Sequence, residues 1–333
     1  MVAGANGANG AAIRLAGITK RFKDKLAVDN LDLVVPTGSV CGFLGPNGAG
    51  KTTTIRMIMS IFNPDAGDIE VLGRRSAIES KDRIGYLPEE RGVYRKMKVK
   101  DFLTYIGVLK GVDRGQLAKW IDEWLEKVEL PGVQKKKCEE LSKGMQQKVQ
   151  FLAAIIHDPE LVILDEPFSG LDPVNARLLR RLIDELHAQG KTIIFSTHVL
   201  HSAEQVCERI FMINNGQKIL DGTIDEIRTQ YDPKSLIVEP ANGSLAEARS
   251  ALGAVRGVHS VHDSTFVGCL EAQLDEGVDA SELVSTVAAA TPVRRVEIRR
   301  ATLEDIFVHL VDPGDSEDSI RASLSDTTHQ GGA

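Results

Sequence analysis

The stretch from Gly45 to Thr53 carries residue types that together could bind the phosphates of a nucleotide. It reads Gly-Pro-Asn-Gly-Ala-Gly-Lys-Thr-Thr and fits the phosphate-loop pattern G-x-x-x-x-G-K-[ST]. Glycines let the backbone approach a ligand without a Cβ clash, and free N–H groups at the start of a helix attract an anion. We expect Lys51 to contact the β- and γ-phosphates and Thr52 to hold Mg²⁺. The rest of the binding loop is expected to comprise Asn47, Gly48, Ala49, Gly50 and Thr53.

The sequence around this loop favours a phosphate site over the structural alternative, a glycine-rich surface turn. Val40–Leu44 is an apolar run that is expected to form a buried strand directly before the loop. Thr52–Ile61 is expected to form the helix that follows it. The motif requires this strand–loop–helix setting, so the loop is predicted to be functional.

A second candidate site lies where another apolar run, Leu161–Leu164, ends in Asp165 and Glu166. A parallel strand that is buried on both faces reads as such a continuous run, and ligands of open α/β sheets bind beyond the carboxyl ends of the strands. Acidic residues also end strands for solubility, so this pair alone would be a weak signal. Together with the loop, Asp165 is expected to hold Mg²⁺ and Glu166 to polarise the attacking water.

With these residues in place, the chain resembles the ATP-binding subunit of ABC transporters over about residues 13–230. Further motifs follow in the family's order and spacing: Leu141–Gln147 is similar to the signature loop LSGGQ, Ser169–Asp172 to the D-loop, and His198 to the switch histidine. Phe22 stands where the family has an aromatic residue that stacks on adenine. Several motifs in register make the resemblance specific.

The resemblance implies a role for each of these residues. Glu166 would be the general base or the water-orienting carboxylate, and His198 would contact the γ-phosphate. Ser142 and Gly144 would touch the γ-phosphate of an ATP molecule that is bound by a second subunit, and Asp172 would organise the contact between subunits. A head-to-tail dimer around two ATP molecules, feasible as a homodimer, would therefore complete each site.

Two segments depart from the family's usual pattern. Glu89 stands where the family usually has glutamine, and Lys143 and Met145 stand in the signature where glycine and glutamine are common. We expect the Glu89 carboxylate to act at Mg²⁺, whereas the alternative is that it faces solvent after a proline turn. Both segments resemble those of bacterial export ATPases of the sodium-efflux and drug-resistance type.

The predicted fold is an α/β phosphate-loop NTPase core of the ABC type, with an antiparallel β subdomain, a helical insert at about 91–157 and a small C-terminal domain. The chain is expected to divide into four parts: a flexible tail at 1–12, the core at 13–230, the small α+β domain at 231–311 and a disordered tail at 312–333. In the small domain we expect strands at 235–239, about 258–262, 265–274 and 293–299, and helices at 244–252, 280–290 and 303–310. This β-α-β-β-α-β order is the ferredoxin-like arrangement.

Composition limits the possible function classes. The 333 residues carry a formal net charge of −7, which argues against nucleic acid as a partner. The apolar runs fall far short of the ~20 residues of a membrane span, so a pore would belong to integral membrane permease subunits. The first residues do not read as a signal peptide, and four cysteines without a C-x-x-C pair fit a reduced cytosol. We therefore expect a cytoplasmic protein that is held at the inner face of the cell membrane through the permease.

These observations favour an ATPase subunit that uses ATP and Mg²⁺ and powers export through a separate permease by ATP-driven dimer closure. A soluble ABC ATPase that acts on ribosomes or DNA remains the alternative, but such proteins usually have two nucleotide domains or a long coiled-coil insert, and this chain has neither. A regulatory module without catalysis would not need Lys51, Asp165, Glu166 and His198 all in place. A neighbouring gene that encodes several apolar spans would favour transport.

Overall fold

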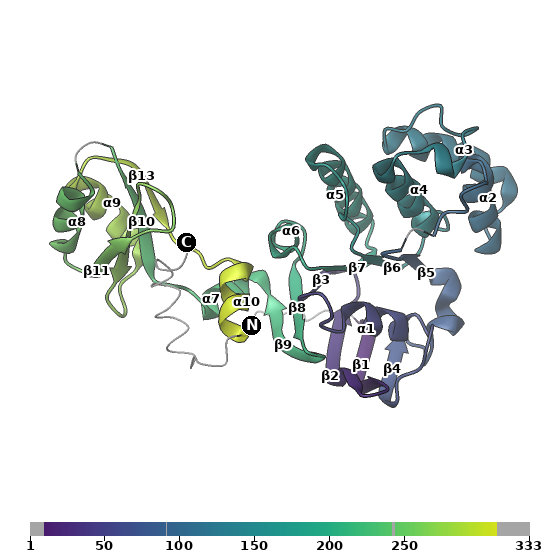
Figure 1. Ribbon diagram of the computed structural model, residues 1–333, viewed down its shortest axis with the longest axis horizontal. Coiled ribbons are helices and arrows are strands. Elements are labelled where there is room, and N and C mark those ends of the chain that lie inside the picture. Colours follow the sequence, from purple (N-terminus) through teal and green to yellow (C-terminus); the bar gives the residue numbers. More distant parts are fainter. Residues whose placement is uncertain (1–9, 91, 242–243, 312–333) are drawn as a thin grey trace, which may run out of the picture. The chain divides into compact units, whose positions relative to one another are not determined.

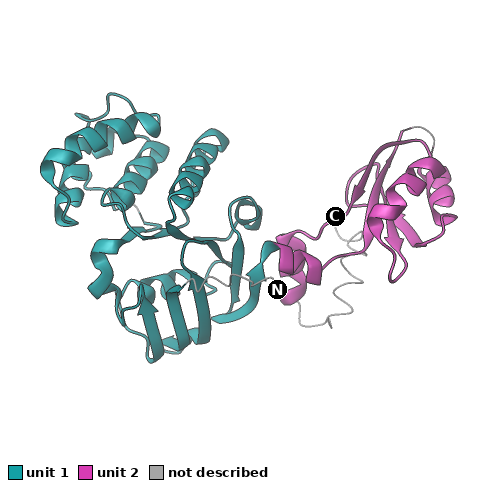
Figure 2. Ribbon diagram, turned by 180° about the vertical axis from the view of Figure 1, so that it is seen from behind, with its two compact units in different colours: residues 1–224 teal, residues 225–333 magenta. Residues whose placement is uncertain are grey.

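The computed structural model describes residues 10–90, 92–241 and 244–311. The chain forms two compact units that part between Ile224 and Asp225 (Figure 2). The sequence placed this boundary at 230/231, six residues later. The predicted tail at 312–333 and the first nine residues of the predicted N-terminal tail lie outside the described residues. Gly10 is described, and Ala11 and Ala12 already belong to the first strand rather than to a tail, because Ala12 is buried and the Thr37 N–H donates to the Gly10 carbonyl.

Unit 1 is built on a six-stranded sheet in the order β5-β6-β7-β3-β8-β9, in which only β9 pairs antiparallel. The strands are β3 (Val40–Leu44), β5 (Ile84–Leu87), β6 (Leu161–Asp165), β7 (Thr192–Thr197), β8 (Arg209–Asn214) and β9 (Gln217–Thr223). β3 and β6 are buried at every residue, as expected for parallel strands covered on both faces. The register sets Asp165 opposite Ser196 and Leu44 opposite Thr197, so the carboxyl ends of three strands meet at one edge.

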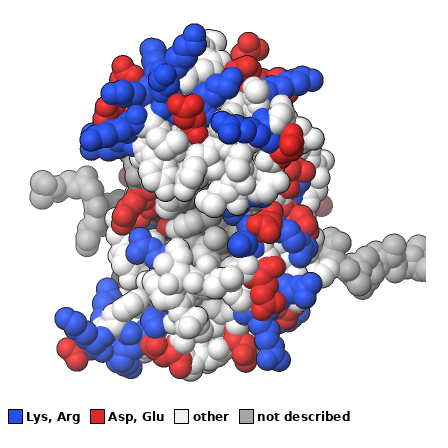
Figure 3. Space-filling model, turned by 90° about the vertical axis from the view of Figure 1, so that its right-hand side faces the viewer, with Lys and Arg blue, Asp and Glu red and all other residues white. Residues whose placement is uncertain are grey.

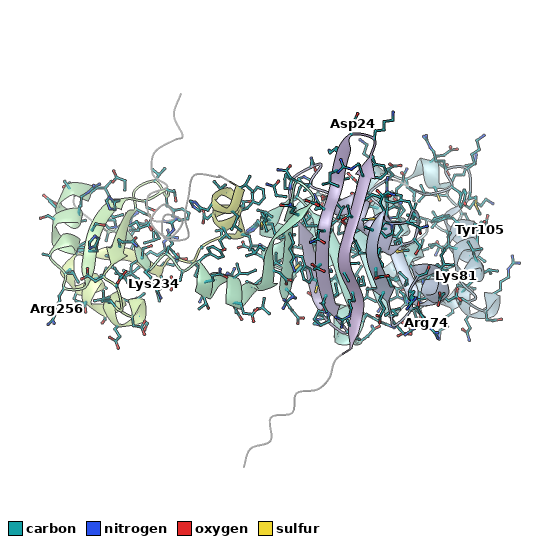
Figure 4. All side chains as sticks on the ribbon, turned by 90° about the horizontal axis from the view of Figure 1, so that it is seen from below. Asp24, Arg74, Lys81, Tyr105, Lys234 and Arg256 are labelled. Carbon is teal, nitrogen blue, oxygen red and sulfur yellow. The ribbon has the colours of Figure 1, made fainter. Side chains whose placement is uncertain are left out.

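A separate antiparallel sheet in the order β2-β1-β4 forms the predicted β subdomain. Its strands are β1 (Ala11–Phe22), β2 (Lys25–Pro36) and β4 (Ala66–Val71). β1 and β2 are long and are joined at one end by the turn that carries Asp24 (Figure 4). This turn places Phe22 at the end of β1. The buried side chains of both strands belong to the same hydrophobic core as β3 and the first helix.

Helices cover both faces of the central sheet (Figure 1). One face carries α1 (Lys51–Ile58) together with the antiparallel sheet, and the other carries α5 (Pro173–Ala188) and α6 (Leu200–Glu204). The predicted helical insert consists of α2 (Val99–Leu109), α3 (Arg114–Lys127) and α4 (Lys143–Ile155), and the short 3₁₀ turns are η1 (Ala77–Arg83) and η2 (Cys138–Glu140). Within the described ranges, no helix is both long and apolar enough to cross a lipid bilayer.

Unit 2 contains a four-stranded antiparallel sheet in the order β11-β12-β10-β13, with α8 and α9 against one face (Figure 1). Its elements are α7 (Ile224–Gln230, which begins at the unit boundary), β10 (Ser235–Pro240), α8 (Leu245–Gly253), β11 (Val258–Asp263), β12 (Leu270–Leu274), α9 (Ala280–Ala290), β13 (Val293–Ile298) and α10 (Leu303–Val311). The strand order and the β-α-β-β-α-β sequence confirm the ferredoxin-like arrangement. The Thr302 hydroxyl and the Asp305 carboxylate each accept the other's backbone N–H, which caps the start of α10.

A buried ion pair ties three segments of unit 2 together. Glu271 on β12 is 2% exposed, and both of its oxygens lie 2.5–2.6 Å from Arg299 Nη1. The Ser235 hydroxyl donates to the same carboxylate at 2.6 Å. The side chain of Arg299 is only 11% exposed, so without Glu271 its charge would lie in a poorly hydrated place.

We therefore expect Glu271→Ala to lower the free energy of unfolding of unit 2 by about 3–5 kcal/mol, because it leaves a buried guanidinium without its counter-charge. The matched variant Asp263→Ala removes an exposed partner of Arg249 and should cost no more than about 1 kcal/mol. Scanning calorimetry of the full chain measures both. Equal losses in the two variants would contradict the buried-pair argument.

Candidate active site

The backbone of the phosphate loop can be formed only with glycine at defined positions. β3 ends at Leu44 and α1 begins at Lys51, which confirms the predicted strand–loop–helix setting. Gly45 has φ 148°, and a Cβ there would lie 2.1 Å from the Ile213 carbonyl oxygen. Gly50 has φ 111°, and a Cβ there would lie 2.5 Å from the Ala27 carbonyl oxygen. The loop therefore lies close against neighbouring backbone at Gly45 and Gly50, where only glycine fits.

Lys51 reaches back over this loop. Its Nζ donates to the Gly45 carbonyl at 2.7 Å and to the Pro46 carbonyl at 3.2 Å. The residue is 6% exposed, and burial lowers the pKa of its ammonium, while the charges of Glu166, Asp165 and Glu89 act in the opposite direction. The three carboxylates thus lie within electrostatic reach of the one buried cation described in this loop.

A cavity of about 400 Å³ opens in front of the loop, within the size range of ligand pockets. Its lining includes most of the predicted nucleotide residues: Phe22, Asn47, Gly48, Gly50, Lys51, Thr52, Thr53, Glu89 and Glu166. Phe22 is 46% exposed and packs edge-on against Phe62 with ring centroids 5.5 Å apart, so one ring face can take a base. Ala49 does not line the cavity. It is 2% exposed and belongs to the hydrophobic core behind the loop.

Asp165 is buried at the end of β6 with one oxygen held and one oxygen unused. The Ser196 hydroxyl donates to Asp165 Oδ1, whereas Oδ2 is buried and has no hydrogen-bond partner in the described structure. Burial raises the pKa of Asp165, as do the charges of Glu89 and Glu166, and the hydroxyls of Ser196 and Thr52 lower it. A buried carboxylate oxygen without a partner, beside a threonine hydroxyl and a second carboxylate, is an all-oxygen donor set of the kind that Mg²⁺ prefers. The residues therefore fit this cation.

Glu166 follows directly, in a strained backbone conformation. Its φ is 50°, in the left-handed region that non-glycine residues rarely adopt and that costs about 1–3 kcal/mol. One carboxylate oxygen, Oε1, lies 2.9 Å from His198 Nδ1 and 4.0 Å from Lys51 Nζ. The other, Oε2, accepts from the Thr197 hydroxyl at 3.3 Å. The carboxylate is thus clamped between the phosphate lysine and the residues at the end of β7.

Ser142, Gly144 and Asp172 are not among the residues that line this cavity. Ser142 is the N-cap of α4, where its hydroxyl accepts the Met145 N–H at 3.3 Å. Asp172 is the N-cap of α5, where its carboxylate accepts the N–H groups of the next turn at 2.9 Å. The two caps are neighbours, because a Cβ on Gly144 would lie 3.6 Å from the Leu171 side chain. Within one chain, these residues therefore form a second cluster apart from the phosphate loop.

Lys25 and Ser196 were not predicted from the sequence. Lys25 lies at the start of β2 and lines the cavity, but a single lysine next to a hairpin turn gives no recognisable signal. Ser196 contacts Asp165 only because β6 and β7 are neighbours in register. Its position two residues before His198 could have suggested a role, but its contact could not be read from spacing.

Comparison with known proteins agrees with this geometry. The ABC transporter family matches residues 28–169, and the C-terminal domain of DrrA1-3-like ATP-binding proteins matches residues 222–311. The ABC transporter ATP-binding protein YhaQ of Bacillus subtilis is 38% identical over 88% of this chain and 96% of its own. The daunorubicin resistance ATP-binding protein DrrA3 of Streptomyces coeruleorubidus is 33% identical over 90% of this chain and 95% of its own. The Nod factor export ATP-binding protein I of Burkholderia lata is 31% identical over 90% of this chain and 97% of its own. A solved ATP-binding subunit of an ABC transporter covers 66% of this chain and 93% of its own with a TM-score of 0.62 and 29% identity.

The chain is a member of the ABC transporter ATP-binding proteins. It binds ATP and is an ATPase subunit of the kind that hydrolyses ATP to power transport. The match over residues 222–311 shows that the chain also has a C-terminal domain of the DrrA1-3-like type. The predicted family and fold class are thereby confirmed.

Glu89, which stands where the family usually has glutamine, lines the cavity. Its charge acts on both Lys51 and Asp165. A carboxylate attracts Mg²⁺ and repels the γ-phosphate, and each unit-charge interaction is about 4 kcal/mol at ~4 Å and an effective dielectric near 20. A cation between the two groups would let attraction prevail. We therefore expect Glu89→Gln to raise the Mg²⁺ concentration needed for half-maximal ATPase activity while leaving the fold intact.

Glu90→Gln is the matched control for this prediction. Glu90 is the next residue, its side chain is 87% exposed, and it faces Arg56 rather than the cavity. Titration of Mg²⁺ at saturating ATP compares both variants with the unaltered chain. Overlapping curves for Glu89→Gln and the unaltered chain would mean that Glu89 does not act at the metal.

Proposed function

We propose that this chain powers export through a separate membrane permease by closing head to tail with a second copy around two ATP molecules. The main support for this proposal is that the predicted site residues form two separate clusters within one chain. One cluster surrounds the cavity at the phosphate loop, and the other gathers Ser142, Gly144 and Asp172 at two helix N-termini. Helix N-termini suit phosphate, so each chain supplies one half of two composite sites.

Each residue of the nucleotide cavity has a separate role in this proposal. Lys51 places a positive charge on the β- and γ-phosphates, and Phe22 stacks on adenine. Thr52, Asp165 and Glu89 would hold Mg²⁺, which supplies charge stabilisation to the transferred phosphoryl group when bound. Glu166 orients the attacking water and accepts its proton.

His198 holds the Glu166 carboxylate through Nδ1, and its side chain is 46% exposed, so its other ring nitrogen could contact the γ-phosphate. The same imidazole would thus connect the Glu166 carboxylate to the γ-phosphate, which the water activated by Glu166 attacks. This arrangement supports a sensing role for His198.

A groove of about 300 Å³ on the helical-insert side of unit 1 supports contact with the permease. Figure 3 shows this side as a hollowed face of mostly uncharged residues with charged residues around it. The groove is lined by Met59, Tyr86, Pro88, Gly92, Phe102, Ile106, Lys110, Gln150, Ala153, Ala154 and His157. Burial lowers the pKa of His157 to about 4, so this ring is neutral at pH 7. Because Pro88 and Gly92 flank Glu89, a segment that docks here would press on the loop that enters the nucleotide cavity.

Export is favoured over import by the relatives, one of which is named for Nod factor export and another for daunorubicin resistance. The DrrA-type C-terminal domain adds to this support. In this proposal the chain is cytoplasmic and lies at the inner face of the cell membrane through the permease. The soluble non-transport ABC ATPase remains the alternative that the experiment must separate.

Affinity capture of the full chain from detergent-solubilised membranes tests the proposal. The unaltered chain should recover a membrane protein with several spans. Ala153→Arg, which fills the groove, should lose that protein and keep ATPase activity. Ala118→Arg, on an exposed position of α3 outside the groove, should keep both. Recovery of ribosomes instead of a membrane protein would support the soluble alternative.

A further inference from the structure

Ser196 has no assigned part in this function, yet it contacts both acidic residues at the end of β6. The residue lies on β7, is fully buried, and stands opposite Asp165 in the register of the sheet. Its Oγ donates to Asp165 Oδ1. The Glu166 N–H lies 3.3 Å from the same Oγ and 3.1 Å from the Ser196 carbonyl.

The chemistry of a hydroxyl fixes the direction of these contacts. Serine has one O–H donor and two lone pairs. Since a carboxylate can only accept, the donor is committed to Asp165, and a lone pair is left for the Glu166 N–H. The same oxygen therefore sets the orientation of one carboxylate and the backbone position of the next residue.

Each contact serves a feature that the site needs. With Oδ1 held, Asp165 presents its unpartnered Oδ2 on the other side. With its N–H held, Glu166 stays in the left-handed conformation, at φ 50°, that carries its side chain to Thr197 and His198. Ser196 and Thr197 at the end of β7, with His198 directly after it, thus hold the Asp165 carboxylate and the backbone N–H and carboxylate of Glu166.

We propose that Ser196 is a positioning residue that sets Asp165 for Mg²⁺ and Glu166 for water at the same time. This inference rests on the proposed function for the identity of the metal ligand and of the base. Residues that orient metal ligands typically contribute 10–100-fold to metal affinity or activity. A serine that only filled space would affect the stability of the fold and would not change the response to Mg²⁺.

The test compares Ser196→Ala with Ser80→Ala. Ser80 is also buried, at 2% exposure, and donates one hydrogen bond, to the Val71 carbonyl, without touching either acid. Calorimetry measures ATP binding to the full chain in the presence of a chelator and then across a Mg²⁺ titration, and a melting curve checks folding. Ser196→Ala should keep the Mg²⁺-free affinity for ATP and need about 10–100-fold more Mg²⁺ for half of the Mg²⁺-dependent gain in affinity. Ser80→Ala should match the unaltered chain in both.

Two results with Ser196→Ala, and one with the unaltered chain, would overturn the proposal. In one, Ser196→Ala responds to Mg²⁺ as the unaltered chain does, so the hydroxyl only fills space. In the other, the Mg²⁺-free affinity falls by the same factor as the affinity with Mg²⁺, so the substitution loosens the whole loop. If ATP binding by the unaltered chain does not respond to Mg²⁺, the proposed metal role of Asp165 fails, and the role of Ser196 fails with it.

Discussion

Glu166→Gln should bind ATP but hydrolyse it about 10²–10⁴-fold more slowly than the unaltered chain. The amide keeps the shape of the carboxylate and can still accept from Thr197, but it loses the negative charge that orients water and takes up its proton. Binding should persist because Lys51, 4.0 Å from this carboxylate, then has less competition for its charge. The variant should accumulate as an ATP-bound dimer, which size exclusion with ATP would detect.

Glu160→Gln provides the control for this substitution. Glu160 directly precedes β6, at the opposite end of the strand from Glu166, and pairs with Arg83 on the surface at 2.6 Å. Exposed pairs contribute at most about 1 kcal/mol, so turnover should be unchanged. Phosphate release at saturating ATP measures both variants. Nearly normal turnover in Glu166→Gln would show that another group is the base.

Lys51→Ala should abolish tight ATP binding. The Lys51 ammonium is buried in the cavity lining, where it would pair with the ATP phosphates. Loss of one partner of a buried charge pair costs about 2–5 kcal/mol of binding free energy. This range corresponds to a loss of about 30- to 4,000-fold in affinity. The substitution also leaves the Gly45 and Pro46 carbonyls without their donor, which loosens the empty loop.

Lys191→Ala is the matched control for the lysine, because its Nζ pairs with Asp158 at 2.7 Å and it does not line the cavity. Calorimetry with Mg²⁺ should show normal affinity for this control. The unfolding temperature of Lys51→Ala separates lost binding from lost folding. Unchanged affinity in a folded Lys51→Ala would contradict the phosphate-loop assignment.

Buried parallel strands were the most predictable part of the fold. Val40–Leu44 forms a strand with the predicted bounds, and the run at Leu161–Leu164 forms one that also includes Asp165, because residues covered on both faces give uninterrupted apolar runs. The helix at Ala280–Ala290 also has the predicted bounds, with Asp279 as its cap. In these segments local pattern and tertiary burial impose the same requirement.

Predictions were wrong where a turn overrode propensity. Thr265–Leu274 was expected to be one strand because Thr265, Phe266 and Val267 favour strands. The structure instead turns there, with the Ser264 N–H donating to the Cys269 carbonyl and Gly268 at φ 78°, so β12 starts at Leu270. The first helix likewise ends at Ile58 instead of Ile61, because Ser60 adopts a φ of 54°, which a helix cannot continue through.

The nucleotide site was predictable to the extent that it depends on contiguous motifs. Loop residues, Asp165 and Glu166 carry their chemistry within a few positions of sequence, whereas Ser196 and Lys25 reach the site only through sheet register and a hairpin. The sequence could indicate that Ser142 and Asp172 are functional residues. It could not indicate that the two N-caps lie side by side, because their proximity depends on how α4 and α5 pack. Whether they meet a second ATP depends on another copy of the chain.

The strand order of the central sheet has a consequence for synthesis on the ribosome. β3, near the start of the chain, lies between β7 and β8, so it must wait for about 150 further residues before its first neighbour exists. At 5–20 residues per second, this wait is about 7–30 s, during which an apolar strand with both edges unpaired is exposed. The antiparallel hairpin of β1 and β2 can form at once, because its contacts are local. Nascent chains that stop before β7 should therefore engage chaperones, and those that extend past β8 should be released from them.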